Sequence, residues 1–263
     1  MTDQLLESTN YGKSYEMLIT LNQSEFHGKE PSIGQIIASP SDAQDMWMVV
    51  DSPYPAEWVG NPSLFRSLDG GNTWQLFNTT AAGLGAQQEP PTYITYWQQN
   101  GSVMYLDGLN GLYVSRDGGN YFMRMNVPAN SSFLGMVSPD PVNGSILFLC
   151  SESGLFESLD SGESWNSLSN FSTNLLFDVA ADGNYIFATA EGMSPLYSND
   201  SGANWTTITK GYLGIASADP YNSSIVILWT ETHTIVGGPF FFVSDNGGKS
   251  FFLPSINFTA EVS

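Results

Sequence analysis

Short apolar runs alternate along the chain with polar segments that contain Ser, Asp and Gly. The clearest example places residues 155–157 before the polar segment 158–164 and residues 165–168 after it. Two strand-like runs joined by an Asp- and Gly-rich turn predict a β-hairpin. The same arrangement surrounds the runs at residues 64–66, 112–114 and 241–243. The pattern therefore predicts an all-β chain made of repeated hairpins.

The turn segment follows the pattern Ser-x-Asp-x-Gly-x-x-Trp. The Asp oxygen and the Ser hydroxyl can accept hydrogen bonds from turn N–H groups. The Gly supplies a positive φ, and the closing aromatic residue anchors the second strand. We interpret these residues as structural turn residues rather than catalysts. The five full copies are Ser67, Asp69, Gly71, Trp74; Ser115, Asp117, Gly119, Phe122; Ser158, Asp160, Gly162, Trp165; Ser198, Asp200, Gly202, Trp205; and Ser244, Asn246, Gly248, Phe251. A degenerate sixth copy is Ser8, Asn10, Gly12 and Tyr15.

The copies recur at intervals of 59, 48, 43, 40 and 46 residues. A period in this range with four strands per unit is typical of a β-propeller. In the third full unit we expect strands at residues 133–137, 145–150, 154–158 and 165–168. The predicted fold class is thus all-β, a propeller of four-stranded antiparallel blades.

The chain ends suggest how the propeller closes. Residues 4–8 and 15–21 predict a first hairpin, and residues 256–262 predict a last strand. Joining them in one composite blade would give six blades without open sheet edges. We therefore expect one propeller domain over residues 1–263. A fragment of a larger propeller in a longer chain is the alternative.

The six turn segments resemble the Asp-box, or bacterial neuraminidase repeat, of sialidase-like β-propellers. The resemblance implies the propeller fold, which hosts sialidases, xyloglucanases, sortilin-type receptors and a photosystem II assembly factor. It also implies that a sialidase would need three inward arginines. Here Arg66 and Arg116 flank turn segments and Arg124 lies in an outer strand, so we expect no sialidase activity. The assembly factor would imply a basic patch, which this chain also lacks.

Composition limits the partners. Lys plus Arg is 7, Asp plus Glu is 26 and the net charge is −19, which excludes binding to nucleic acid through a basic patch. The sequence contains no run of 18 apolar residues, so it predicts no membrane span. The beginning of the sequence does not look like a signal peptide, which suggests a longer chain or an unusual export route.

Half of the asparagines lie in Asn-x-Ser/Thr sequons, 10 of 20. This excess predicts a glycosylated extracellular or cell-surface protein, although β-turns are rich in these residues anyway. The candidate glycosylation sites are Asn22, Asn78, Asn100, Asn130, Asn143, Asn170, Asn199, Asn204, Asn222 and Asn257.

Metal and nucleophile chemistry has little support in the sequence. The lone Cys150 lies in an apolar strand and is predicted to be buried. His27 and His233 are too few and too far apart in sequence for a zinc site. We expect no cofactor and no catalytic metal, with N-linked glycans and a structural cation as the options left open.

Candidate ligand-binding residues fall in loops at the end of the blades opposite the turn segments. The loops at residues 51–63, 78–92 and 230–239 are predicted to project there. Trp97 and Trp229 lie inside predicted strands and are assigned to the core. The candidate ligand-binding residues are Tyr54, Trp58, Glu231 and His233.

An acidic residue follows the second strand of every full unit. The residues are Asp51, Asp107, Glu152, Glu191 and Glu231. They could bind a cation or supply a general acid and a general base. We favour solvated loop-end carboxylates, because repeat symmetry alone does not place two carboxylates on opposite sides of one bond.

The sequence favours a surface propeller that works by binding or structural assembly without catalysis. Its partner would be a protein or a carbohydrate at the cell surface, or the other subunits of a larger extracellular assembly. The alternative is a glycoside hydrolase of the sialidase-like or xyloglucanase-like type. That enzyme would use a carboxylate pair from Asp51, Glu57, Glu152, Glu191 and Glu231.

Overall fold

The computed structural model describes residues 4–7, 14–20, 32–51, 64–84, 91–108, 111–128, 134–151, 153–169, 176–182, 185–190, 196–208, 213–219, 222–231 and 240–252. These residues form 21 β-strands and no helix. All strand pairings are antiparallel, from β1–β2 near one end of the chain to β20–β21 near the other. The described part of the chain is therefore all-β, as the sequence predicts.

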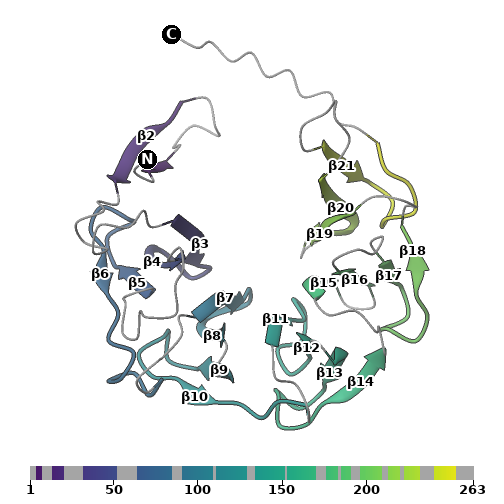
Figure 1. The fold of residues 1–263 in the computed structure, drawn as a ribbon, viewed down its shortest axis with the longest axis horizontal. Coiled ribbons are helices and arrows are strands. Elements are labelled where there is room, and N and C mark those ends of the chain that lie inside the picture. The colour runs from purple at the N-terminus through teal and green to yellow at the C-terminus, as the bar shows by residue number, and fades with distance from the viewer. Residues whose placement is uncertain are drawn as a thin grey trace. The chain divides into compact units, whose positions relative to one another are not determined.

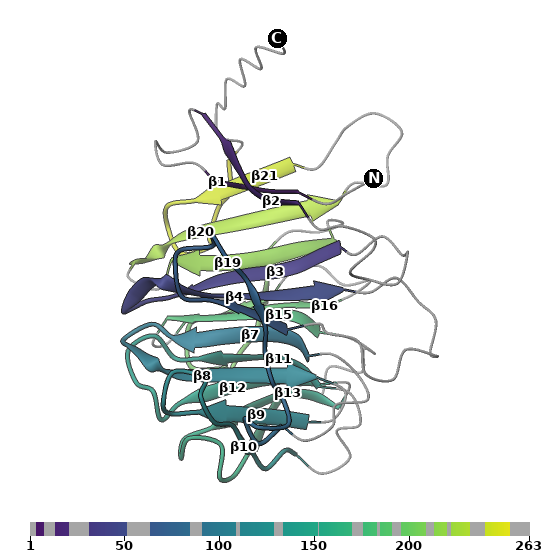
Figure 2. The ribbon, with the colours of Figure 1, turned by 90° about the vertical axis from the view of Figure 1, so that its left-hand side faces the viewer.

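The chain divides into two compact units, residues 1–137 and 138–263. The first unit contains one two-stranded and two four-stranded sheets, and in the sheet β7–β10 the strands lie side by side in chain order (Figure 1, Figure 2). The strands are β1 (Gln4–Glu7) and β2 (Glu16–Thr20); β3 (Ser32–Ser39), β4 (Asp42–Asp51), β5 (Leu64–Ser67) and β6 (Gln75–Leu76); and β7 (Pro91–Trp97), β8 (Asn100–Gly108), β9 (Gly111–Ser115) and β10 (Met123–Arg124).

The second unit repeats the four-stranded plan. The division between the units falls inside β11, whose sheet partners β12, β13 and β14 belong to the second unit. The strands are β11 (Leu134–Pro139), β12 (Leu147–Ser151), β13 (Gly154–Ser158) and β14 (Asn166–Ser169); β15 (Leu176–Asp182), β16 (Tyr185–Ala190), β17 (Leu196–Ser198) and β18 (Thr206–Thr207); and β19 (Leu213–Asp219), β20 (Asn222–Glu231) and β21 (Phe240–Ser244).

The predicted blade plan is confirmed strand by strand in the sheet β11–β14, whose order is β11-β12-β13-β14. Its strands begin and end within two residues of the predicted bounds. In the last sheet the described residues show the fourth strand only as a bridge between Val243 and Phe252. Residues 256–262 lie outside the described residues, so the composite sixth blade and the single-domain closure stay predictions.

The core of the first unit lies between its sheets. Along β4, Trp47 and Val49 belong to one buried cluster, while Met48 and Val50 belong to another. Successive strand residues point to opposite faces, so both faces of this strand are buried. The first cluster includes residues of the next sheet, so the sheets β3–β6 and β7–β10 pack face to face. The residues that the next sheet contributes to this cluster are Ile94, Tyr96, Met104, Leu106, Tyr113 and Phe122.

The second unit shows the same packing on both sides of one sheet. Ile186 in β16 packs with Phe148 and Cys150 of β12. Its neighbour Phe187 points the other way and packs with Val226 of β20. The sheet β15–β18 therefore lies between the other two sheets of this unit. Cys150 is fully buried, as predicted.

Candidate functional site

The five full copies of the Ser-x-Asp-x-Gly-x-x-Trp segment form the same turn, which we call the repeat turn. In the third copy the Ser158 hydroxyl donates to Asp160 at 2.8 Å and accepts the Gly162 N–H at 2.8 Å. The Asp160 carboxylate also accepts the Ser164 N–H at 2.9 Å and the Ser164 hydroxyl at 2.6 Å. The polar groups of the motif are thus used inside the turn. Ser8, Asn10 and Gly12 of the sixth copy lie outside the described residues.

These hydrogen bonds determine how the turn carboxyls titrate. Bonds from the side chain and N–H of Ser164 and from Ser158 lower the pKa of Asp160 to about 2. The pKa of Asp69 and that of Asp200 are lowered by equivalent bonds, from Thr73 and Asn204 first. A general acid needs a raised pKa, so the carboxyls of the repeat turns are poor candidates for catalysis.

The motif Gly has a second role that the sequence alone does not reveal. A Cβ on Gly119 would lie 2.4 Å from Cζ2 of Trp47, in the preceding sheet. On Gly202 it would lie 2.9 Å from Cδ1 of Leu168, also in the preceding sheet. The motif Gly is therefore needed both for its positive φ and for close packing between neighbouring sheets.

The hairpin between the first two strands of a blade is bonded directly to the repeat turn of that blade. The Gly70 N–H donates to the Gln44 carbonyl at 3.0 Å, and the Gly118 N–H donates to the Ser102 carbonyl at 2.9 Å. The N–H of Ser161 donates to the Ser145 carbonyl at 2.9 Å in the sheet β11–β14. At one end of each of these blades, the hairpin and the repeat turn are therefore joined by a backbone hydrogen bond.

The acidic residues at the opposite end of the blades are not all equivalent. The residues that pair with the first Ser of the repeat turn set the register: Met46, Met104, Leu147, Ile186 and Val226. Asp51, Glu152, Glu191 and Glu231 each follow their reference residue by five positions, whereas Asp107 follows Met104 by three. Asp107 therefore occupies the position of Val49 and Cys150.

Asp107 is fully buried, as are Val49 and Cys150 at the equivalent core positions. Its strand β8 continues to Gly108, which pairs with Gly111. One of the five predicted loop-end carboxylates, Asp107, is therefore a buried strand residue. The residue at the matching position of this blade is Leu109.

The structure places only part of the predicted site. Asp51 is the last residue of β4 and Glu231 is the last residue of β20. The two lie in different units. Tyr54, Glu57, Trp58, Glu152, Glu191 and His233 lie outside the described residues. No group of three or more His, Cys, Asp and Glu side chains that could hold a metal occurs in the described part of the chain.

One predicted loop packs against its neighbour instead of projecting. The expectation for residues 78–92 is wrong for the part that the structure describes. The Ala82 N–H donates to the Asn78 carbonyl at 3.1 Å, and the Ala82 carbonyl accepts the Phe122 N–H at 2.8 Å. Ala82 and Leu84 are buried in the core of the first unit. The buried side chains of Ala82 and Leu84 therefore keep residues 78–84 packed against the core of the first unit.

The sequence analysis also missed a hydrogen-bonded arginine in the first unit. The Arg66 guanidinium donates to both oxygens of Asp45, at 2.8 and 2.9 Å, and lies over the Trp47 ring at 4.8 Å from its centroid. It also donates to the Gly118 carbonyl at 2.9 Å and to Asn120 at 3.2 Å. The hydrogen bond that Arg66 donates to Asp45 raises the pKa of Arg66. Arg66 thereby connects two neighbouring sheets.

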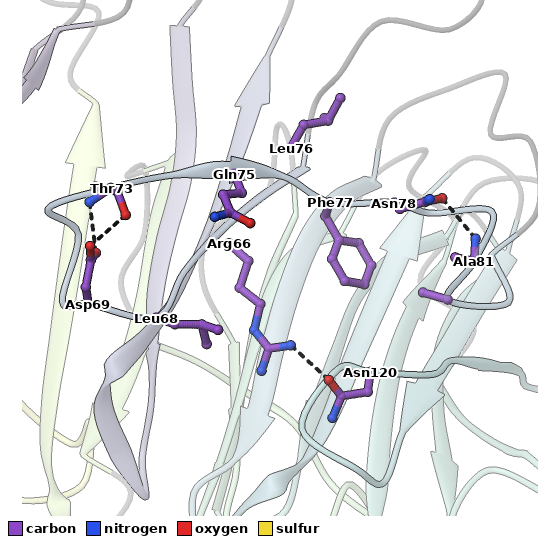
Figure 3. A pocket seen from close by; sticks show the side chains of 11 residues that line it. Arg66, Leu68, Asp69, Thr73, Gln75, Leu76, Phe77, Asn78, Ala81 and Asn120 are labelled. Carbon is purple, nitrogen blue, oxygen red and sulfur yellow. Dashed lines mark hydrogen bonds between the residues drawn. The ribbon is translucent and has the colours of Figure 1, made fainter.

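A pocket of about 380 Å³ lies beside Arg66 (Figure 3). Its walls combine the exposed side chains of Leu68 and Leu76 with Phe77 and amide groups. In Figure 3 the guanidinium points toward Asn120 from one side of the pocket. Because Arg66 is already bonded to Asp45, Gly118 and Asn120, it is poorly suited to clamp an anionic substrate.

Comparison with known proteins identifies catalytic relatives. No family model matches the chain. The xyloglucanase of Hypocrea jecorina (strain QM6a) is 25% identical over 213 residues, which are 72% of this chain and 25% of the relative. The chain thus spans about a quarter of the length of that curated relative.

Solved structures support the fold class. The GH74 xyloglucanase from Xanthomonas campestris superposes with a TM-score of 0.64 at 16% identity, over 84% of this chain and 38% of that chain. YCF48 from Cyanidioschyzon merolae superposes with a TM-score of 0.53 at 15% identity, over 86% of each chain. Both likenesses bear on the fold alone. Together with the four-stranded antiparallel sheets they confirm the predicted β-propeller class.

These relatives correct the functional expectation. The prediction of a binding or assembly module without catalysis is wrong, because the sequence relative is named as a xyloglucanase. The findings favour the alternative, a glycoside hydrolase. No helix within the described ranges is long and apolar enough to cross a membrane.

Proposed function

We propose that this chain is the propeller part of a glycoside hydrolase that acts on a polysaccharide, with xyloglucan as the first candidate substrate. The observation that carries the proposal is the 25% identity over 213 residues to a xyloglucanase. We also propose that the repeat turns place the chain among Asp-box propellers. An extracellular location belongs to the proposal, because a polymeric glucan does not cross a membrane.

The chemistry requires two carboxyl groups on either side of the scissile bond. One protonates the leaving oxygen, and the other acts as a base or a nucleophile. The turn carboxyls are unsuitable because their hydrogen bonds lower their pKa. Asp107 is unsuitable because it is fully buried and cannot reach a polymer.

The remaining candidates are loop-end carboxylates. In the first unit these are Asp51 and Glu57, and in the second they are Glu152, Glu191 and Glu231. Asp51 and Glu231 end a second strand, where a carboxylate is not needed to bond the repeat turn. Tyr54 and Trp58 are candidate stacking platforms for sugar rings, with His233 as a polar contact.

The proposal is tested by incubating the purified protein with xyloglucan, mixed-linkage β-glucan and hydroxyethylcellulose. New reducing ends and oligosaccharide masses are measured over time. We expect release from xyloglucan, because the sequence relative is a xyloglucanase. The two other glucans control for general β-glucan cleavage. If none of the three polymers yields new reducing ends, the proposal is wrong.

A further inference from the structure

Three of the described sequons lie at the same place in three blades. Asn100 begins β8, Asn143 precedes β12 and Asn222 begins β20. Each lies in the hairpin between the first two strands of its blade. We infer that these three asparagines, the hairpin sequons, carry N-linked glycans. This inference does not depend on the proposed hydrolase function.

The hairpin sequons present the reactive amide nitrogen to solvent. Their Oδ1 atoms accept the N–H of the sequon serine at 2.9, 3.1 and 3.2 Å in Asn100, Asn143 and Asn222, respectively. All three side chains are exposed. Among the described residues, no hydrogen bond occupies any of the three Nδ2 atoms. Nδ2 is the atom to which an N-linked glycan is attached, so a glycan there displaces no hydrogen bond of the described residues.

The hairpin is also fixed in place by its blade. The carbonyls of the sequon serines Ser102, Ser145 and Ser224 accept an N–H of the repeat turn at 2.9, 2.9 and 3.0 Å, respectively. Each glycan would therefore be held at the end of its blade that carries the repeat turn. The opposite end of each of these blades would carry no glycan from these three sites.

Turn geometry alone does not explain the sequon residues. In the sheet β3–β6 the same hairpin contains Asp42, whose Oδ1 accepts the Gln44 N–H at 2.9 Å. The Gln44 carbonyl likewise accepts the N–H of Gly70 at 3.0 Å. That hairpin makes the same two bonds without an amide or a hydroxyl. The turn requires only the side-chain oxygen. In the β20 hairpin the Ser224 hydroxyl also donates to Asn222 Oδ1 at 2.5 Å, but no such bond joins Ser102 to Asn100 or Ser145 to Asn143 among the described residues. The Asn-x-Ser combination in those two hairpins therefore has another cause.

Asn204 provides a contrast inside the same chain. Its Nδ2 donates to the Asp200 carboxylate at 2.7 Å, and its backbone N–H donates to the same carboxylate at 2.8 Å. A glycan on this nitrogen would compete with a bond of the repeat turn. We therefore expect the hairpin sequons to be modified and Asn204 to remain unmodified.

The test is peptide mapping by mass spectrometry of the full protein purified from its native source. We expect glycan masses on the peptides that contain Asn100, Asn143 and Asn222, and the unmodified mass on the peptide that contains Asn204. Unmodified hairpin peptides would overturn the inference. Equal occupancy at Asn204 would overturn its geometric basis.

Substitutions separate glycosylation from turn stability. Asn143→Asp keeps the acceptor oxygen, as Asp42 does naturally, and Ser145→Ala keeps the asparagine while removing the sequon. Both variants should lose one glycan mass and keep their fold, as judged by the thermal unfolding midpoint after enzymatic deglycosylation. Ser145→Thr preserves the sequon and is the matched control. A glycan that persists in Ser145→Ala would contradict the inference, whatever the outcome of the hydrolysis assay.

Discussion

The two ends of a blade use their polar side chains in different ways. At the repeat-turn end, Ser158 is fully buried and Asp160 accepts three hydrogen bonds from its own turn. At the other end, the structure describes Asp51 and Glu231 as the last residues of β4 and β20. By sequence position alone, the equivalent residues of the other blades are Glu152, Glu191 and Leu109. Residues that recur in every blade therefore maintain the fold. Catalytic residues are expected at positions whose side chains are not used in the hydrogen bonds of the repeat turn.

The largest expected effect is on hydrolysis. Changing a carboxylate to an amide at the loop-end positions, as in Asp51→Asn or Glu231→Gln, should lower kcat/KM for a catalytic residue by about 10²- to 10⁴-fold. The physical reason is that an amide neither donates the proton nor activates the nucleophile. Initial rates of reducing-end release measure the effect for each variant.

The matched control for this scan is Asp160→Asn at the repeat-turn end. It makes the same chemical change and should leave kcat/KM unchanged, because Asn246 already serves the fifth copy of the turn. If Asp160→Asn reduces the rate as much as the loop-end variants, the division of roles between the two ends is wrong. The division of roles is also wrong if the amide variants of all five loop-end candidates keep the kcat/KM of the natural protein.

The next effect concerns packing at the repeat turn. Gly118 and Gly119 both have positive φ, of 71° and 83°, but a Cβ on Gly118 would meet no atom within 4 Å. Gly119→Ala combines backbone strain with the contact on Trp47 and should lower the free energy of unfolding by about 2–4 kcal/mol. Gly118→Ala tests the strain alone and should cost about 1 kcal/mol.

Urea unfolding of the two variants measures the difference between them. A larger loss in Gly119→Ala assigns the excess to the packing of neighbouring sheets. Equal losses in the two variants would mean that the neighbouring sheet yields, and that the motif Gly serves the turn only.

These positions also mark how far sequence reasoning reaches. The repeated Ser, Asp and Gly predict the turns, the period and the four-stranded sheets, because they act over a few residues. The sequence does not reveal that Trp47 lies against Gly119 or that Arg66 bonds Asn120, since these contacts depend on how sheets pack. The sequence pattern groups Asp107 with the loop ends, because only strand pairing reveals the register.

A smaller effect on the free energy of unfolding distinguishes the two serines of one repeat turn, Ser158 and Ser164. Ser158→Ala leaves the buried Gly162 N–H without its acceptor and should destabilise the protein by about 1–3 kcal/mol. Ser164→Ala removes only an exposed bond to Asp160 and should cost less. Denaturant unfolding compares the two. A greater loss in Ser164→Ala would contradict the assignment of Ser158 as the main stabilising residue of the turn.

The smallest effect is the acid response of the turn carboxyl. Hydrogen bonds from Ser164 and Ser158 lower the pKa of Asp160 from 3.8 to about 2. A folded-state pKa below the unfolded value stabilises the native protein above the unfolded pKa, and this stabilisation is lost as pH falls through the folded pKa. Its contribution should therefore be complete above about pH 5 and should disappear between about pH 5 and pH 2.

Asp160→Asn isolates this contribution, because an asparagine keeps the turn but does not titrate. The difference in free energy of unfolding between the natural protein and the variant should be constant above about pH 5 and should change as the pH falls from about pH 5 to pH 2. The chemical shift of the Asp160 side-chain carboxyl carbon, followed by NMR as the pH is changed, gives the pKa directly. A midpoint near 3.8 would mean that the turn bonds do not favour the carboxylate over the acid. The turn carboxyls would then lose the feature that sets them apart from the loop-end carboxylates.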